Sequence, residues 1–458
     1  MAKQNLSFRR HRVAETLEND LCRDINEGRL APGSLILSIE ELSKRYNLKF
    51  PTTQKALKRL EQAGYLVTKH GSGTFVADRF KKSSLRLAIG GGSSVEDFLQ
   101  ERICSRGLPI TIVQSNDDPE ADIICSSGPA RDRTEMGCFV PLETLMRPDD
   151  PLMRPDGWLA GACDRFRLGG HTYALPVYLS PVVLYYNSRM LEKAGVEVSA
   201  EPWTWSEFAR IIKKLRPVCD TTHAGVMPFP DVLDYYMPFI AQNNGHLYSS
   251  DNKCALLQKE TLEAIRFVRR LSSLSGGTVP EDSKDLRDRF LNGRSAFIMA
   301  GGNMSYQLLR AKPFQWGWRP LPVGKTKATI LFAEGLQISA HSENRAAAWD
   351  FIRECLSEEA QRFFVDQCLP FPSRRGLVDE FVLRHGKSYA RYLDECSWGN
   401  TERHNVGRRV RTALNSEMIG FLNPGLSDEG LVALCGQAAR VVDRLIATAK
   451  VGGQEVFA

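Results

Sequence analysis

The sequence has no long hydrophobic run. Nowhere in its 458 residues does a stretch approach the roughly 20 consecutive apolar residues that a helix needs to cross a bilayer. The first residues, MAKQNLSFRRHRVAETLEND, also lack the continuous apolar core of a secretory signal. These two absences argue against a membrane-spanning or secreted protein, and we expect a cytosolic one.

Paired metal ligands and paired thiols are also missing. The 11 cysteines are odd in number, are scattered from Cys22 to Cys435, and never have C-x-x-C spacing. The sequence therefore indicates neither a disulfide framework nor a zinc ribbon, and we expect reduced thiols. The 8 histidines form no H-x-x-x-H pair, so we expect no metal and interpret His171 and His223 as polar loop residues.

Signatures of catalysis are absent too. There is no G-x-S-x-G elbow and no obvious pair of carboxylates on a shared element, so nothing points to an enzyme. The glycine-rich stretch AIGGGSSVED could be taken for a phosphate loop. It lacks both the G-x-G-x-x-G spacing and a Walker Lys-Ser/Thr pair, so we expect no nucleotide and no other cofactor.

What the chain does have is an uneven distribution of charge. Its 43% hydrophobic and 25% charged content is that of an ordinary globular protein, with room for about three domain-sized cores. Residues 1–82 carry 16 lysines and arginines against 9 aspartates and glutamates, a net charge of +7. Because the whole chain carries +6, the remainder carries −1. The N-terminal part alone is suited to attract phosphates.

Helix signals fill this basic part. Four apolar residues recur every four positions and predict one helix that ends at Gly28: Val13, Leu17, Leu21 and Ile25. Ser38 then precedes a short helical segment with acidic residues in its first turn, as a capped helix prefers. Asn47 and Leu48 form a turn before PTTQKALKRLEQAG, a second helix with an apolar face and a stop at Gly64.

Two short β runs complete the module. Residues 65–68 and 74–76 have strand character, and the basic, glycine-bearing tip KHGSG joins them into a hairpin suited to lie over a phosphate backbone. The whole segment resembles the winged helix of GntR-type bacterial transcription regulators, in INEGRLAPGS, TTQKALKRLEQAGYL and GSGTFV. It departs from that family at Glu40, Phe50 and Gln54, where arginines are usual. Since arginine contacts guanine edges bidentately, the usual operator sequence of the family is not expected here.

The resemblance implies a set of DNA-contacting residues. Thr52, Thr53, Gln54 and Lys55 are expected nearest the bases, and the wing tip is expected over the phosphates. The full expected set is Ser38, Lys49, Phe50, Thr52, Thr53, Gln54, Lys55, Lys58, Lys69, His70, Gly71, Ser72 and Gly73.

A second domain begins near Leu85, after the polar, basic stretch DRFKKSSLR. Apolar runs at LRLAIGGG, PITIVQS and ADIICSS, with a helical stretch over 95–104, have the β-α-β rhythm of an α/β sheet. Helices follow at TWSEFARIIKKL, starting at Thr204 or Ser206, and at KETLEAIRFVRRLSSL. A late amphipathic helix, LVALCGQAARVVDRLIATAKV, is expected to pack on its own domain, with a partner as the alternative.

Roughly residues 85–400 resemble the sugar-type bacterial extracellular solute-binding proteins of ABC importers. The resemblance lies in the tight turn at Gly169 and Gly170, Tyr173 to Pro176, Tyr185 to Asn187, and Trp203 to Trp205, with Ala174 in place of the usual glycine. Downstream, FLNGRSAFIMAGG, WGWRPLPVG and LPFPSRRG follow in the order usual for that family.

This second resemblance implies two α/β lobes, of the periplasmic-binding-protein type II, that close on a polar small molecule. Sugar clefts need aromatics for the apolar ring faces and amides or carboxylates for the hydroxyls. Candidates at expected turns, among them Tyr178 after a Leu-Pro turn, are Ser93, Ser94, Tyr178, Asp231, Tyr235, Gly302, Asn303, Trp316, Glu334 and Phe371.

The sequence therefore predicts a multidomain regulator: an α+β winged helix at 8–78, a linker at 79–84, and a two-lobed sensor at 85–458. It is expected to bind palindromic operator DNA as a homodimer and to be controlled by a small polar effector, a sugar by the resemblance. The alternatives are a transport receptor without a regulatory role, and a GntR-type chain with an aminotransferase-like half. For the latter we find no lysine in a cofactor-pocket context.

Overall fold

The computed structural model describes most of the chain. The described residues are 17–18, 20–21, 24–25, 29–30, 32–62, 65–69, 71–77, 85–90, 94–106, 110–115, 118–126, 137–146, 150–159, 162–199, 201–219, 232–249, 253–275, 283–367, 371–386, 388–400, 408–423 and 425–451. Val13, Gly28, Gly64 and the expected linker 79–84 lie outside them, as do the site candidates His70, Ser93 and Asp231.

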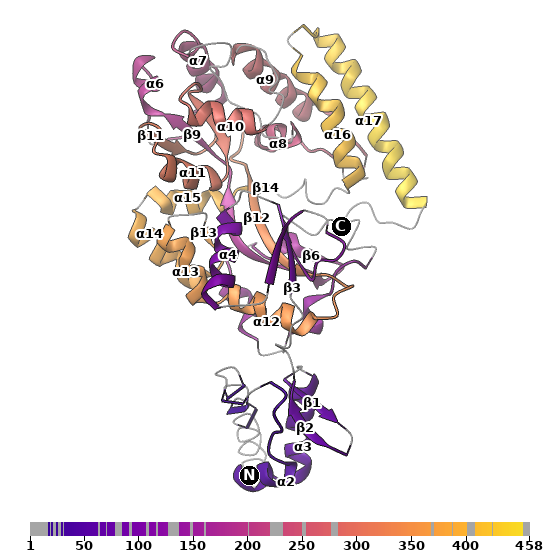
Figure 1. Cartoon of the computed structure of the whole chain (residues 1–458). Helices are drawn as coiled ribbons and strands as arrows, with labels where there is room; N and C mark the ends of the chain where they lie inside the picture. The colour runs from indigo at the N-terminus through magenta and orange to yellow at the C-terminus, as the bar shows by residue number, and fades with distance from the viewer. Residues whose placement is uncertain are drawn as a thin grey trace, which may run out of the picture.

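The N-terminal domain is a winged helix (Figure 1, indigo). Helices α2 (Ile39–Arg45) and α3 (Phe50–Gln62) form the helix pair, and strands β1 (Leu66–Lys69) and β2 (Gly73–Val76) form an antiparallel wing. The expected cap is present, since Ser38 Oγ accepts a hydrogen bond from the Glu41 backbone and the Glu41 carboxylate accepts one from the Ser38 backbone. One apolar core joins these elements: Leu17, Leu21, Ile25, Ile36, Leu42, Ala56, Leu57, Leu60, Leu66 and Val76.

Lobe 1 of the second domain is built on a sheet with the strand order β13-β8-β12-β5-β3-β4, onto which β14 pairs at β12. Strand β3 is parallel to both β4 and β5, which confirms the predicted β-α-β rhythm. Helices α4, α12 and α13 share one apolar core with this sheet. The bounds are β3 Leu85–Ile89, α4 Ser94–Arg106, β4 Ile110–Gln114, β5 Ile123–Ser126, β8 Ala174–Pro181, β12 Thr329–Ile338, α12 Arg345–Cys355, α13 Glu358–Gln367, β13 Phe371–Pro372 and β14 Gly399–Asn400.

Lobe 2 has a three-stranded antiparallel sheet, β10-β9-β11, with helices on both faces. The strands are β9 Val183–Asn187, β10 Phe297–Ala300 and β11 Trp316–Arg319. Its helices are α6 Ser188–Lys193, α7 Trp205–Leu215, α8 Val232–Gln242, α9 Lys259–Ser275, α10 Ser283–Leu291, α11 Asn303–Ala311, α14 Val378–His385, α15 Ser388–Cys396, α16 Arg408–Ile419 and α17 Asp428–Val451.

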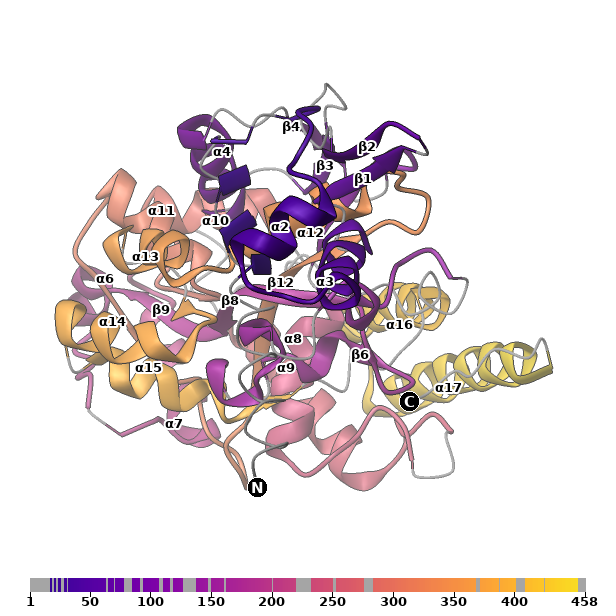
Figure 2. The same ribbon diagram turned by 90° about the horizontal axis from the view of Figure 1, so that it is seen from below.

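Several local predictions are confirmed in these lobes. Thr204 caps α7 in a capping box with Glu207, and α9 follows the predicted apolar spacing. Gly169 and Gly170 make the tight turn between β6 (Arg167–Leu168) and β7 (His171–Thr172), both with positive φ. Helix α17 packs on its own lobe, lying beside α16 and α9 (Figures 1 and 2).

The two lobes are joined through continuous strands. Only Val182 separates β8 of lobe 1 from β9 of lobe 2, and β12 returns the chain from lobe 2 to the centre of the lobe 1 sheet. Strands β8 and β12 are antiparallel neighbours over most of their length. Any change in the angle between the lobes must therefore bend the chain at the ends of these two strands. In the described ranges no helix is long and apolar enough to span a bilayer.

Candidate functional site

The helix pair of the winged helix is fixed by polar contacts as well as by its core. Asn47 takes the left-handed conformation that the turn between the helices requires, with φ of 51°. Ser43 of α2 donates a hydrogen bond of 2.9 Å to Thr53 Oγ1 of α3. Arg59 of α3 forms an ion pair of 3.1 Å with the buried Glu18 carboxylate. These contacts hold α3 in one orientation, as a helix that enters a groove of DNA requires.

Most of the predicted contact residues of α3 lie on its free face. Lys49, Gln54, Lys55 and Lys58 are exposed, Phe50 is 49% exposed and Thr52 is partly exposed. Thr53 is a correction, because it is 0% exposed and its hydroxyl lies between Ser43 and the Lys49 carbonyl. Its role is to join α2 to α3, and it has no surface with which to contact a base. Ser38 is exposed, but its hydroxyl is engaged in the cap of α2.

The wing tip has a defined backbone geometry. Lys69 and Gly73 are paired across the hairpin, and the Ser72 amide donates to the Lys69 carbonyl at 2.9 Å. Gly71 and Gly73 have φ of 75° and 110°, a region that side-chain-bearing residues rarely adopt. The Lys69 ammonium lies 4.9 Å from the Phe75 ring centroid, which holds an exposed cation on the wing.

Two of the predicted ligand-binding residues meet in the sheet of lobe 1. Tyr178 of β8 is the direct cross-strand partner of Glu334 of β12 and donates a hydrogen bond to its carboxyl group. Cys125 of the next strand, β5, donates to Glu334 Oε2 at 3.9 Å. Glu334 remains partly exposed while Tyr178 is buried. A carboxyl group thus lies at the strands that join the lobes, with one side open to a ligand.

Burial dominates the electrostatics of this group. It raises the pKa of Glu334 to about 7, against the opposing effects of the Tyr178 hydrogen bond and the Arg165 charge. Arg165 is itself buried, which lowers its pKa to about 10, and its Nη1 donates to the Leu331 carbonyl of β12 at 2.5 Å. Arg165 therefore stays a cation at neutral pH, whereas Glu334 titrates near neutrality.

The residues at the start of α11, in lobe 2, contact strand β8 of lobe 1. The Gly302 amide donates to Ser180 Oγ of β8 at 2.5 Å, and Ser180 is two residues from Tyr178. A Cβ at Gly301 would lie 2.6 Å from Ser180 Oγ, so this close approach requires a glycine. Gly302 therefore contacts β8, the strand that carries Tyr178, and Asn303 is the first residue of α11.

Two predicted ligand-binding residues lie elsewhere. Tyr235 is 1% exposed and packs against Tyr236 and Phe239 in the core of lobe 2. Trp316 pairs with Asn187 at the end of β9 farther from β8, and its ring packs on Tyr185. Four residues of strand, about 13 Å, separate that position from the end of β9 next to β8. The expectation for Tyr235 is corrected, whereas the role of Trp316 stays a prediction.

The Leu-Pro segment is also corrected, since it forms no turn. Leu175 and Pro176 lie within β8, where the pairing with β12 changes register between Glu334 and Gly335. Phe371 pairs through its backbone with Leu179 of the same strand, next to Tyr178, and Ser94 is the first residue of α4. The side chains of Phe371 and Ser94 lie outside the described part.

Sequence reasoning missed Arg165, Cys125 and Ser180. No local pattern marks Arg165 as buried, because its contacts with Leu331 and Glu334 come from β12, more than 160 residues away. For Cys125 the sequence indicates only a reduced thiol. Ser180 follows Tyr178 with the period of two that places residues on one face of a strand, so alternation along β8 was the available signal.

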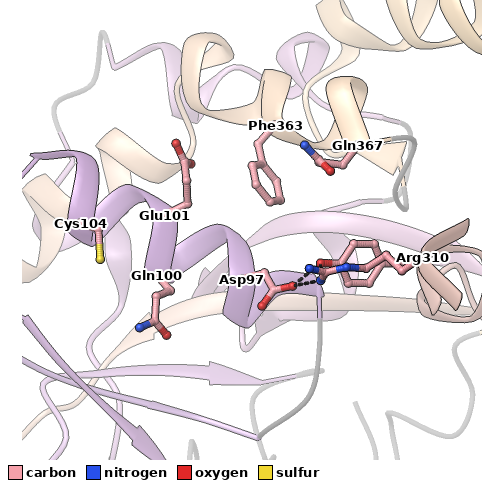
Figure 3. A pocket seen from close by; sticks show the side chains of 8 residues that line it. Asp97, Gln100, Glu101, Cys104, Arg310, Phe363 and Gln367 are labelled. Atoms are coloured by element: carbon pink, nitrogen blue, oxygen red, sulfur yellow. Dashed lines mark hydrogen bonds and ion pairs between the residues drawn. The ribbon is translucent and has the colours of Figure 1, made fainter.

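A second contact crosses between the lobes, at α4 and α11. Arg310 Nη1 of α11 lies 2.9 Å from Asp97 Oδ2 of α4, and the Tyr306 hydroxyl also donates to Asp97 (Figure 3). These side chains border a pocket of about 410 Å³ with the lining Asp97, Gln100, Glu101, Cys104, Tyr306, Arg310, Phe363 and Gln367. Helix α4 belongs to the core of lobe 1, whereas α11 follows β10 of lobe 2.

The structure thus defines a class, a winged-helix DNA-binding domain joined to a two-lobed solute-binding fold. The family described as bacterial extracellular solute-binding protein matches residues 107–362, more than half of the chain, and the chain belongs to it. Residues 13–76 match the family of bacterial regulatory proteins of the gntR type, so the N-terminal domain is a GntR domain.

Individual relatives agree with this assignment. A binding protein of Brucella abortus is 23% identical over 225 residues, which cover 47% of this chain and 54% of the relative. The chain thus spans about half the length of the curated relatives it matches. An ABC transporter solute-binding protein from Thermotoga lettingae bound with alpha-D-tagatose superposes with a TM-score of 0.68 and 18% identity, over 80% of this chain and 100% of that one. UgpB from Mycobacterium tuberculosis, in complex with glycerophosphocholine, gives the same four values.

The raised pKa of Glu334 predicts a pH-dependent stability. In the unfolded chain the carboxyl group titrates near 4.5, so between about pH 4.5 and 7 the folded state binds the extra proton. The free energy of unfolding should therefore fall as pH rises through this window, by on the order of 2 kcal/mol. Glu334→Gln should remove that component. Denaturation at pH 5 and pH 8, followed by tryptophan fluorescence, measures this change in the free energy of unfolding. All seven tryptophans follow residue 85, so the signal reports on the second domain. Equal pH slopes in the two proteins would contradict the assignment.

The contact between α4 and α11 predicts an effect on lobe closure. Arg310→Ala removes an ion pair that exists only while the two helices are close, so ligand affinity should fall, by up to about fivefold for an exposed pair. Isothermal titration with an identified ligand measures the change. Arg266→Ala is the matched control, since Arg266 pairs with Asp428 between α9 and α17 inside lobe 2. Equal losses in both variants would show that the contact has no specific role in closure.

Proposed function

We propose that the chain is a cytosolic transcription regulator whose affinity for operator DNA is controlled by a small polar ligand, of the carbohydrate class, bound between the lobes. The observation that carries the proposal is the presence of a GntR domain and a solute-binding domain in one chain. The two solved relatives named above bind tagatose and glycerophosphocholine, ligands that both carry hydroxyl groups.

The chemistry of the hinge supports a ligand of this class. Glu334 offers carboxylate oxygens that accept hydrogen bonds from hydroxyl groups, and the partly exposed side of the group leaves room for them. A hydroxyl bound there replaces water as the partner of the carboxylate. Because Glu334 lies on β12, a ligand at this point contacts a strand that joins the lobes and can favour one angle between them.

The coupling to DNA follows from symmetry. GntR-type winged helices are proposed here to act as a homodimer on a palindromic operator, with half-sites about one helical turn apart. A ligand that changes the relative position of the two sensor domains changes how well both recognition helices fit. The coupling is reciprocal, so operator DNA must change ligand affinity by the same factor.

The second candidate is a receptor of an ABC-type transporter without a regulatory role. It is favoured by the match to solute-binding proteins over most of the chain. It gives no role to the GntR domain or to the +7 net charge of residues 1–82. The two candidates differ in whether the ligand changes DNA binding.

Ligand and DNA binding can be tested in one design. The full chain is screened by thermal shift against mono- and oligosaccharides and, in parallel, against glycerophosphodiesters and other polar metabolites. A ligand at about 100 times its dissociation constant should stabilise the sensor by roughly 2.7 kcal/mol. The active compound should then change the affinity for a selected operator duplex. A thermal shift without any change in DNA affinity would favour the receptor, and a shift from another class alone would refute the carbohydrate assignment.

The wing and the recognition helix should contribute differently to DNA binding. Lys69→Ala removes a cation expected over a phosphate, so affinity should fall similarly for all sequences and the salt slope should decrease by about one unit. Thr52→Ala should instead change sequence preference with the salt slope unchanged. Fluorescence anisotropy at several salt concentrations, on specific and random duplexes, measures both. The reverse pattern would mean that the two elements have exchanged roles.

A further inference from the structure

Helix α3 has two faces of opposite character. Its buried face carries Thr53 and an apolar set that packs in the core of the winged helix. A stripe of Phe50, Gln54 and Lys58, spaced by four residues, runs from the margin of the buried face onto the exposed side of the helix. Gln54 and Lys58 are exposed and Phe50 is 49% exposed.

Phe50 is not part of the domain core. The core of the winged helix includes Leu42, and Tyr46 and Leu48 near the turn before α3 pack against it, but Phe50 belongs to neither set. An aromatic side chain left half in water gains free energy when a partner covers it, at about 25 cal/mol for each Å² of apolar surface. The stripe therefore presents an apolar group to whatever contacts this end of α3.

Charge identifies that partner as DNA. Lys49, Lys55 and Lys58 are exposed around the stripe, and no acidic residue lies in the first turn of α3. Residues 1–82 as a whole carry a net charge of +7. A helix N-terminus free of acids and flanked by lysines attracts phosphates. The apolar and amide groups between the lysines then face the base edges.

We propose that Phe50 and Gln54 select A·T base pairs in the major groove, Phe50 by contact with the 5-methyl group of thymine and Gln54 by paired hydrogen bonds with N6 and N7 of adenine. The 5-methyl group is the one apolar group that the major-groove edges present, and phenylalanine has no polar atom with which to contact the others. A glutamine amide has the donor and the acceptor that adenine requires. The proposal rests on the DNA-binding role proposed above and specifies the sequence that this role selects.

The test begins with the full chain and a pool of random-sequence duplexes. Enriched duplexes should contain a repeated half-site with A·T pairs at the positions that α3 protects. In an enriched duplex each thymine is then replaced singly by deoxyuridine, which removes only the methyl group. One replacement should weaken wild-type binding about fourfold, and that effect should vanish in Phe50→Ala. Replacing the contacted adenine by 7-deazaadenine should weaken binding about tenfold for the wild type and much less for Gln54→Ala.

Two further variants sharpen the result. Val67→Ala is the matched control, because Val67 is an exposed apolar residue of the wing and its loss should leave the methyl effect intact. Phe50→Arg should move the preferred base from thymine to guanine, with sensitivity to 7-deazaguanine. Phe50→Leu keeps an apolar side chain and should keep part of the methyl effect, which separates the loss of the contact from misfolding.

Three outcomes would overturn the proposal. One is enrichment of G·C pairs at the protected positions, and another is a wild-type protein indifferent to every thymine replacement. The third is a Phe50→Ala variant that weakens binding to all duplexes equally, since Phe50 would then contact a protein surface instead of a base. These results differ from failure of the proposed function, in which no duplex is enriched and no salt-dependent DNA binding is observed, an outcome that refutes both.

Discussion

The pairing of β8 with β12 is the constraint on which the proposed interlobe site depends. Pro176 has no N–H to donate to a ladder, and the register changes beside it, so that Gly335 pairs with Pro176 and Val177 is left opposite no partner. The carbonyl of Val177 instead accepts a hydrogen bond of 2.7 Å from the side-chain amide of Gln361 in α13. The Oε1 atom of the same amide accepts a hydrogen bond from the Ser373 backbone N–H. This bulge fixes which residues of β8 and β12 face each other, and it brings Tyr178 opposite Glu334.

The same bulge explains the glycine at 335. A Cβ there would lie 2.7 Å from the Phe166 ring, so a larger residue would displace the segment that carries Arg165. Arg165 in turn holds the Leu331 carbonyl of β12 and places its charge near Glu334. A backbone irregularity, a glycine and a buried guanidinium therefore act together on one carboxyl group. Bulges next to binding sites commonly aim a side chain in this way.

The sequence predicted elements better than contacts, for a physical reason. Caps and turns depend on residues a few positions apart, which is why Ser38, Thr204 and the Gly169–Gly170 turn were found. Thr53 and Tyr235 were misassigned because polarity or aromaticity does not reveal which face of a helix is covered. The distance of Trp316 from β8 could not be predicted either, because it depends on strand register in another part of the chain. Arg165 could not be found from a local pattern, since its hydrogen bond to the Leu331 carbonyl and its interaction with Glu334 come from a strand more than 160 residues away.

The lobes meet at the strands β8 and β12 and again at the helices α4 and α11, and the strength of the second contact limits what it can contribute to ligand control. Arg310 is 65% exposed and Asp97 is 48% exposed, and pairs of this kind contribute about 0–1 kcal/mol. Moving a two-state equilibrium from 1:99 to 99:1 requires about 5.5 kcal/mol of differential binding. The contact between α4 and α11 cannot supply that difference, so it adjusts the balance between open and closed lobes without setting it. On the proposed function, the larger part comes from contacts that the ligand itself makes at the strands that join the lobes, where Glu334 is only partly exposed and each hydrogen bond has more effect than at the surface.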